Sequence, residues 1–178
     1  SGNVLWTKLH QSSGSDIGHA VTTDSSNNIY VTGMTTGGLD ENTQVGSGDM
    51  FLVKYNSSGN KQWTQQLGTS SSDIGYAVTV DNSDNIYVTG DTWGGLDGNT
   101  NSGNGNNDIF LVKYNSSGTK QWTKQLGTSS DDRGYGVMVD SSNNVYVTGY
   151  TYGGIDGNSN WGGKDLFLVK YSSGTPTL

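Results

Sequence analysis

The 178-residue chain contains 28 Gly, 5 Trp and 10 Tyr, one Pro and no Cys, and its formal net charge is -7. The absence of cysteine excludes disulfides and thiolate zinc sites, and the acidic balance argues against a nucleic-acid partner, because phosphate binding needs a basic face. No run of 18 apolar residues is present, so the sequence predicts no membrane span. The apolar residues recur in regular clusters, which indicates an ordered, turn-rich all-β protein.

The first predicted strand is Asn3–Leu9, a Trp-containing segment that recurs as Lys61–Leu67 and Lys120–Leu126. A Ser/Thr/Asp loop follows it. Next comes a hairpin, in which Gly18–Asp24 and Ile29–Gly33 are two strands of β-branched and aromatic residues joined by Asp, Ser and Asn turn residues. The hairpin has two further copies, so the chain is built from internal repeats.

A Gly/Asn-rich loop follows each hairpin, and after it comes the most apolar strand of the repeat, which is Met50–Tyr55 in the first copy, Ile109–Tyr114 in the second and Leu166–Tyr171 in the third. The hairpin glycines Gly33, Gly90 and Gly149 recur at a nearly constant interval. The sequence therefore predicts one propeller unit over 1–178, made of three repeats at about 3–59, 60–118 and 119–174.

Four short antiparallel strands per repeat are typical of a β-propeller blade. Phe110 and Val112 point to one face of their strand, and Ile109 and Leu111 to the other, so this strand must be covered on both faces. Blades stacked around an axis provide that cover. The small residues of the first hairpin strand place it innermost, and the Trp strand is then outermost. A solenoid of stacked β-units competes with this architecture, but its coils usually have shorter periods.

These strands resemble the bacterial beta-propeller repeat family, often called SBBP. The resemblance rests on the Tyr-Val-Thr-Gly strand, the Leu-Asp-Gly-Asn loop, the Asp-x-Phe-Leu-Val-Lys-Tyr strand and the Ser-Ser-Gly-x-x-x-Trp turn, and it covers nearly the whole chain. It implies an extracellular or cell-surface bacterial protein. It transfers no catalytic residue.

Three blades are too few for a closed ring, since propellers have typically four to eight. The third repeat also lacks an outer strand, whereas the strand at Val4–Leu9 lacks a blade. An open stack would expose an apolar face at each end and an unpaired sheet edge. We therefore expect a six-bladed homodimer in which Val4–Leu9 of each chain completes the partner's blade. A nine-bladed trimer and a fragment of a longer propeller enzyme or array are the alternatives.

The sequence offers no convincing catalytic set. It has two histidines, of which His10 is predicted in a turn and His19 replaces a tyrosine of the other repeats. Glu41 is the only glutamate, whereas a glycosidase needs two close carboxylates. The lysine that recurs in the apolar strands, Lys54 in the first repeat, is expected to pair with an aspartate of a neighbouring repeat. We expect no enzymatic activity.

The strongest chemical pattern is the Gly/Asn loop, which places oxygen-bearing side chains on alternate residues, as calcium requires. The EF-hand glycine position and terminal Glu are missing, and Asx-turns within the loop explain the same residues. The candidate calcium ligands are Asp40, Asn42 and Asp49 in the first repeat, Asp97, Asn99, Asn101 and Asp108 in the second, and Asp156, Asn158, Asn160 and Asp165 in the third.

Three aromatic residues beside these loops, Trp93, Tyr152 and Trp161, vary among the repeats and are candidates for glycan binding. Capping of the blade edge or subunit contact is the alternative role. Together these features predict a non-catalytic extracellular scaffold or adhesion module, with a multivalent, lectin-like glycan-binding module as the main alternative.

Overall fold

The computed structural model describes residues 2–103 and 105–172. Within them lie β1 (Asp16–Thr23), β2 (Ile29–Thr35), β3 (Asp49–Tyr55), β4 (Lys61–Leu67), β5 (Asp73–Val80), β6 (Ile86–Thr92), a short 3-10 turn (Leu96–Gly98), β7 (Asp108–Tyr114), β8 (Lys120–Leu126), β9 (Asp132–Val139), β10 (Val145–Thr151) and β11 (Asp165–Tyr171).

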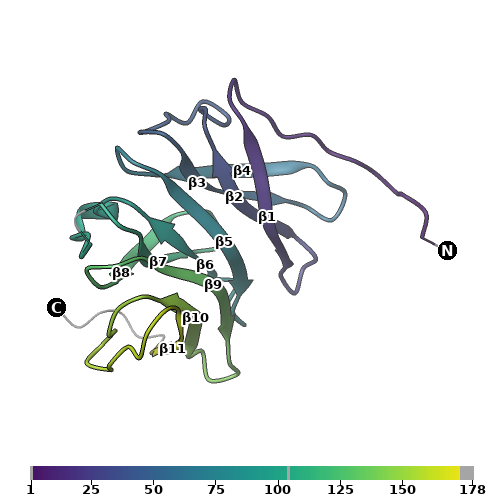
Figure 1. Cartoon of the computed structure of the whole chain (residues 1–178). Coiled ribbons are helices and arrows are strands. Elements are labelled where there is room, and N and C mark those ends of the chain that lie inside the picture. Colours follow the sequence, from purple (N-terminus) through teal and green to yellow (C-terminus); the bar gives the residue numbers. More distant parts are fainter. Residues whose placement is uncertain (1, 104, 173–178) are drawn as a thin grey trace.

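The strands form three separate antiparallel sheets (Figure 1). Two sheets are four-stranded, in the orders β1-β2-β3-β4 and β5-β6-β7-β8, and the third is three-stranded, β9-β10-β11. The predicted all-β fold and the strand order within each blade are confirmed, and within residues 2–103 and 105–172 the third blade has no outer strand, as predicted. The blades fan out in an open arc, with β1, β5 and β9 along its inner side. The described part of the chain therefore holds three blades that do not close into a ring.

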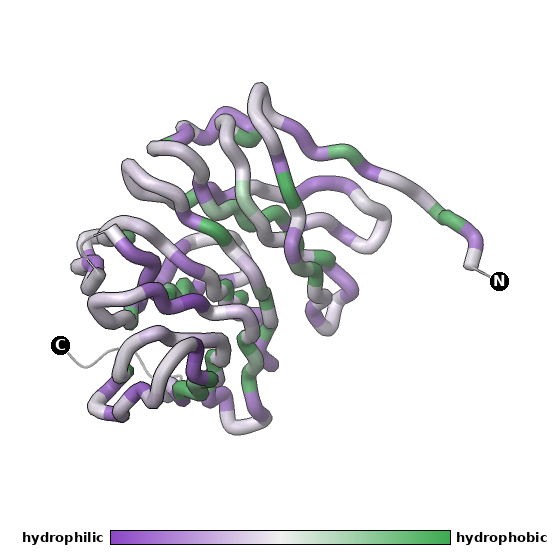
Figure 2. Tube along the Cα trace, viewed as in Figure 1, coloured by the Kyte–Doolittle hydropathy of each residue, from purple (hydrophilic) through white to green (hydrophobic). Residues whose placement is uncertain are grey.

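The core lies between the blades, and β7 shows why. Phe110 and Val112 pack in a cluster with Met50 and Leu52 of the first blade, as the alternating pattern predicts. On the opposite face of β7, Ile109 packs in a cluster with residues of the third blade, among them Val145 and Phe167. Hydrophobic residues accordingly follow the facing strands, whereas hydrophilic residues dominate the loops (Figure 2). Both faces of β7 are thus covered by neighbouring blades, as a strand that is apolar on both faces requires.

An aspartate organises each hairpin turn, and it is buried in the first two repeats. Asp81 accepts hydrogen bonds from the backbone amides of Ser83 (2.8 Å) and Asn85 (2.9 Å) and from the hydroxyl of Tyr87 (3.0 Å). Burial raises the pKa of Asp81, but the hydrogen bonds from Asn85, Ser83 and Tyr87 outweigh it and lower the pKa below its ordinary value. Asp84 adopts a φ of 58°, the left-handed conformation that Asp and Asn tolerate best. The Asp, Ser and Asn residues of the repeat are therefore turn structure.

Each innermost strand contains a β-bulge at the same place. The strand pairing skips His19 in β1, Tyr76 in β5 and Tyr135 in β9. The partner strand crosses so closely there that a Cβ on Gly90 would overlap the carbonyl oxygen of Ile74. The repeated glycine of the Tyr-Val-Thr-Gly strand is thus a packing requirement.

We expect Gly90→Ala to lower the free energy of unfolding by about 1–3 kcal/mol, because the added methyl group overpacks the bulge. It would lie 2.9 Å from Cε1 of Phe110 as well as against Ile74. Urea denaturation measures the change. Gly163→Ala is the control, since no atom lies within 4 Å of a Cβ there. Equal stability of the two variants would contradict this account of the bulge.

Two expectations need correction. Residues 2–15, all within the described part, form no strand, so the strand predicted at Asn3–Leu9 is wrong for the single chain. Its backbone pairs with no strand of the described chain, and the segment runs past the first blade as an extended arm whose N-terminal end projects beyond it (Figure 1). The repeated lysine does not pair with an aspartate of the next repeat. Instead, Lys54 lies over the Tyr30 ring (5.2 Å) and donates to the carbonyl oxygen of Ser116 (3.2 Å).

Candidate functional site

The two ends of the arc are the most distinctive surfaces of the molecule. At the third-blade end, β11 is the edge of its sheet, and no fourth strand pairs with it among the described residues. Leu166 and Leu168 on this strand are 83% and 67% exposed, whereas Met50 and Leu52 at the same positions of β3 are completely buried. The third blade therefore presents an apolar face and an unpaired edge at the same place, as the sequence predicts.

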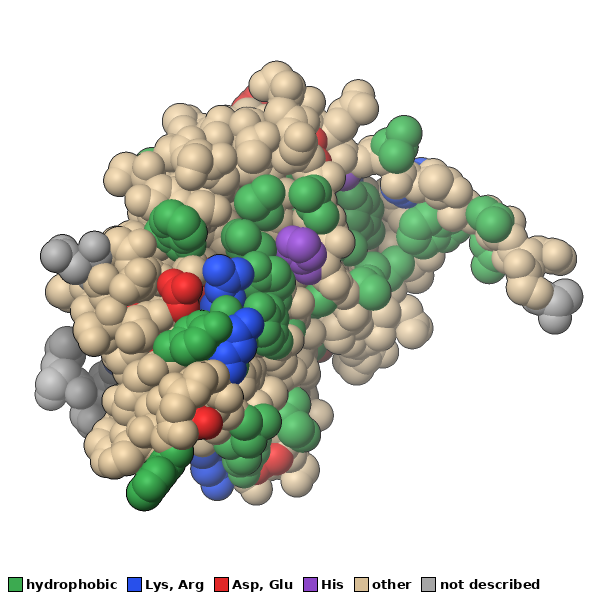
Figure 3. All heavy atoms as spheres, in the orientation of Figure 1, with side chains coloured by type: hydrophobic (Ala, Val, Ile, Leu, Met, Phe, Trp, Pro, Cys, Tyr) green, Lys and Arg blue, Asp and Glu red, His purple; other side chains and the backbone are tan. Residues whose placement is uncertain are grey.

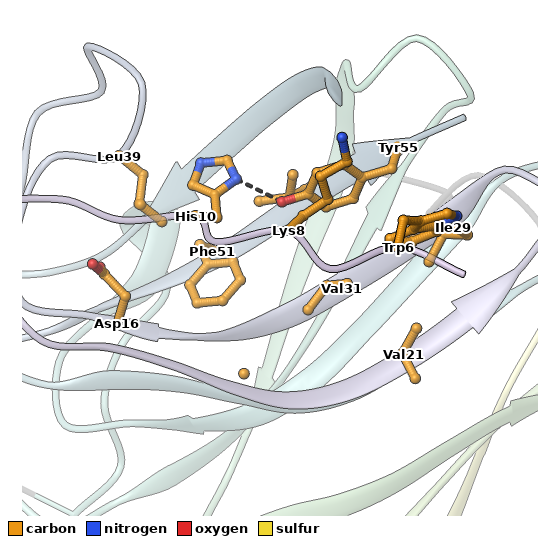
Figure 4. A pocket seen from close by; sticks show the side chains of 12 residues that line it. Trp6, Lys8, His10, Asp16, Val21, Ile29, Val31, Leu39, Phe51 and Tyr55 are labelled. Carbon is orange, nitrogen blue, oxygen red and sulfur yellow. Dashed lines mark hydrogen bonds between the residues drawn. The ribbon is translucent and has the colours of Figure 1, made fainter. Parts of the chain in front are cut away.

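The first-blade end is hollowed by a cavity of about 340 Å³ between the sheet and the arm (Figure 4). Trp6, Lys8 and His10 of the arm lie over it. Apart from Asp16 and Gly18 of β1, the blade side of the cavity consists of apolar residues from β1, β2, β3 and the loop after β2. They are Val21, Ile29, Val31, Leu39, Phe51, Val53 and Tyr55.

These positions have a direct counterpart in the second blade, one repeat later in the chain. There the equivalent residues are covered by Tyr30, Met50 and Leu52 of the first blade. The covered set is Val78, Ile86, Val88, Leu96, Phe110, Val112 and Tyr114. The cavity at the first-blade end is therefore an inter-blade core that lacks the side chains of a preceding blade.

The arm lies on the first blade much as β4 lies on the second. A Cβ on Gly59 would be 3.2 Å from Cδ2 of Trp6, and a Cβ on Gly118 would be 3.0 Å from Cδ2 of Trp63. Trp6 and Trp63 hold the same position in consecutive copies of the Trp-containing segment. The arm thus occupies the place of the outer strand of a preceding blade whose other strands are not supplied by this chain.

His10 fixes the end of the arm. Its Nδ1 is 2.7 Å from the Tyr55 hydroxyl, and its Nε2 is 2.7 Å from Oδ2 of Asp40. Burial raises the pKa of Asp40, but hydrogen bonds from Lys61 and Thr64 outweigh it and hold the pKa below its ordinary value. The turn predicted at His10 is not found, because the residue belongs to the extended arm. The repeat places His10 where Leu67 packs on the next blade, so hydrogen bonds replace an apolar contact.

The Gly/Asn loops use their candidate calcium ligands internally. The last aspartate of each loop accepts a backbone amide of its own loop: Asp49 from Val45 (2.8 Å), Asp108 from Ser102 (2.7 Å) and Asp165 from Trp161 (2.8 Å). Gln66 and Gln125 on the outer strands also donate to Asp49 and Asp108, at 2.7 and 3.0 Å.

The other loop ligands are engaged in a similar way. Asn42, Asn99 and Asn158 donate to carbonyl oxygens three residues earlier. Asn101 and Asn160 accept amides two residues later, and Asp97 binds Lys120 and Thr123, as Asp40 binds Lys61 and Thr64. Asp40, Asp97 and Asp156 all adopt the left-handed backbone conformation, with a φ of 49° at Asp156. Among the described residues no group of three His, Cys, Asp or Glu could hold a metal ion. Calcium binding stays a prediction.

The loop aromatics are exposed but are not gathered into one platform. Trp161 is 92% exposed, and Trp93 and Tyr152 are roughly half exposed. Tyr152 packs edge-on against Tyr150, at 5.6 Å between ring centroids, and Lys164 lies over both rings. Within the described chain, no aromatic pair joins Trp93, Tyr152 and Trp161 to one another. Each is available to a ligand only singly.

The structure also brings together residues whose grouping the sequence analysis did not predict. The bulge residues form an aromatic row along the inner side of the arc, with ring centroids 5.2 Å apart for His19 and Tyr76 and 5.0 Å apart for Tyr76 and Tyr135. Hydrophobic, charged and histidine side chains gather over these inner strands (Figure 3). Tyr135 continues the row to Tyr150, at 5.8 Å.

Beside this row, Asp91 of the second blade faces Arg133 of the third, with 3.5 Å between Oδ2 and Nε. Asp91 is only 1% exposed. Burial raises its pKa to about 6, against the attraction of the guanidinium group. Both residues depart from the repeat. Met34 and Tyr150 occupy the position of Asp91 in the other two repeats, and Ile17 and Ile74 occupy the position of Arg133. That paired departure was the signal that could have revealed this inter-blade contact.

The raised pKa gives a stability prediction. The folded protein holds a proton on Asp91 more tightly than the unfolded chain does, so stability should fall as pH rises from about 4 to about 6. A pKa rise from 3.8 to about 6 corresponds to at most about 3 kcal/mol. Asp91→Asn should remove this part of the pH dependence, measured by urea denaturation across that range.

Asp84→Asn is the matched control, because it makes the same charge change and gives the residue found at Asn27 and Asn143 in the other repeats. Asp73 and Asp132 also have raised pKa values from burial, so some slope should persist in every variant. An unchanged pH profile in Asp91→Asn would contradict the assignment.

The fold and its open ends define a class: an all-β protein of repeated antiparallel sheets consistent with propeller blades. The chain belongs to the SBBP beta-propeller repeat family, whose repeat matches residues 6–40, 62–97 and 121–160, more than half of the chain. The resemblance predicted from the sequence is thereby confirmed.

Two curated proteins are similar to this chain. An uncharacterized WD repeat-containing protein of Acanthamoeba polyphaga mimivirus is 29% identical over 191 residues, which covers 85% of this chain and 14% of the relative. The regulatory protein FlaEY of Caulobacter vibrioides is 23% identical over 188 residues, covering 97% of this chain and 20% of the relative. The chain thus spans a fifth or less of these relatives. Within the described residues, no helix is long and apolar enough to cross a membrane.

Proposed function

We propose that this protein is a non-catalytic β-propeller scaffold or adhesion module, located outside the bacterial cell or on its surface. In its functional form two copies close into one six-bladed ring. The observation that carries the proposal is the pair of complementary ends: an unpaired edge with exposed leucines on the third blade, and a partly covered inter-blade cavity on the first.

The family and the relatives support a scaffold role. SBBP repeats match all three units, and one relative is described as WD repeat-containing. Repeated blades present several similar loop edges on one face, which suits multivalent contact. We assign no catalytic step, because the loop carboxylates Asp49, Asp108 and Asp165 are bound by amides of their own loops.

The mass in solution tests ring closure. We expect twice the 18.9 kDa chain mass by light scattering at micromolar concentration. A variant with Leu166→Ser and Leu168→Ser should shift the protein to monomer, because both leucines would be buried by the neighbouring blade. Trp93→Ser is the control, since it removes an exposed apolar side chain from a loop of the second blade, which belongs to neither end of the arc. A stable wild-type monomer would contradict the ring and favour a longer covalent array.

A glycan-binding module is the second candidate, and the exposed loop aromatics favour it. Aromatic faces next to Asn, Asp and backbone amides suit sugars. If this function holds, Trp93→Ala or Trp161→Ala abolishes retention on a glycan array without changing the thermal melting temperature. Tyr152→Ala tests the third position. The absence of wild-type binding on a broad array would remove this candidate and leave the scaffold role.

A further inference from the structure

The geometry points to a specific partner surface: residues 4–10 of a second copy form the fourth strand of the third blade by pairing with β11. This inference rests on the six-bladed ring proposed above and assigns the strand and the register that close it. Three observations carry it. They are the position of the arm, the apolar residues that line the cavity, and the strand register of the two complete blades.

The position of the arm is already that of an outer strand. Trp6 lies against Gly59 as Trp63 lies against Gly118, and His10 contacts Tyr55. The arm therefore lies where its backbone can pair with the edge strand of any sheet that stacks on the first blade. Val4, Leu5 and Leu9 are 81–90% exposed in the single chain, which leaves the segment free to pair.

The cavity accepts the side chains that the third blade exposes. In the second blade, the equivalent apolar set is covered by Tyr30, Met50 and Leu52 of the first blade. By the repeat, the corresponding residues of the last blade are Tyr146, Leu166 and Leu168. A second copy whose third blade stacks on the first blade would bring these three side chains to the cavity and bury the two exposed leucines.

The register follows from the two complete blades. Leu52 pairs with Gln65 and Lys54 with Trp63 in the first blade, and Leu111 pairs with Lys124 in the second. Transferred by the repeat, Lys8 of one copy lies opposite Leu168 of the other, and Trp6 lies opposite Lys170. Thr7 lies opposite Val169, where Thr64 and Thr123 occur in the complete blades.

One position of the arm departs from the outer strands. Gln66 and Gln125 each tie the strand to the blade: Gln66 accepts the Leu39 amide (3.0 Å) and donates to Asp49 (2.7 Å). Leu9 stands at this position in the arm. The exchanged strand thus lacks an amide bridge to Asp165, which makes the closing blade weaker than the covalent ones.

Disulfide trapping tests the strand and its register. Because the chain contains no cysteine, only the two introduced cysteines can form a disulfide. The variant carries Lys8→Cys and Leu168→Cys and is oxidised under mild conditions. We expect a covalent dimer on a non-reducing gel. The control carries Lys8→Cys and Leu166→Cys, a diagonal pair too far apart to bridge without backbone movement, and should stay uncross-linked.

The outcomes separate this inference from the ring itself. A dimeric mass without in-register cross-linking overturns the strand exchange while leaving the ring. A monomeric mass without cross-linking overturns both. A disulfide within one chain overturns the second copy as the source of the strand. A cross-linked trimer keeps the exchanged strand and overturns the six-bladed ring.

A gain-of-function variant gives an independent measurement. Leu9→Gln gives the arm the glutamine that the complete outer strands carry at this position. Its side-chain amide should bond Asp165 and the Ile155 backbone amide of the other copy. The dimer dissociation constant should therefore fall roughly tenfold. Leu5→Gln is the control, because Gln62 at the same position of β4 donates only to the carbonyl oxygen of Asn60 in its own strand turn. Equal affinity of both variants, measured by analytical ultracentrifugation, would overturn the register.

Discussion

The structure depends on strands that are apolar on both faces. β7 packs Phe110 against the first blade and Ile109 against the third, and both side chains are almost completely buried. A strand of this kind cannot belong to an isolated sheet, because one face would then meet water. The described chain of three blades therefore has one blade face without a neighbouring blade at each end.

The blade faces at the two ends of the arc differ in how far they are covered. The first blade is partly protected by its own arm, which carries Trp6 and His10 over the cavity. The third blade is left bare at Leu166 and Leu168, next to an unpaired edge. Natural sheets usually cover or charge such edges, since they invite pairing with another chain. The combination of a protected hollow and an open edge favours a specific partner over indiscriminate association.

The polar residues divide into those that build the repeat and those that distinguish one blade from another. Asp81 and its equivalents hold the hairpin turns, and Asp49 and Asp108 hold the loops, so their repetition reflects local hydrogen bonding. Asp91 and Arg133 occur once and join two particular blades. Single departures from the repeat are therefore the places where this scaffold has acquired features beyond its fold.

The sequence by itself determined the blades. The alternation at Phe110 and Ile109, the Asp-rich turns and the period between Gly33 and Gly90 are local patterns, and local backbone preference suffices to read them. The tertiary structure decided what those patterns could not encode. The Trp6 segment forms no strand in one chain, because a strand needs a neighbour that this chain does not place there. Asp91 and Arg133 belong to different repeats and meet only because β6 of the second blade packs against β9 of the third.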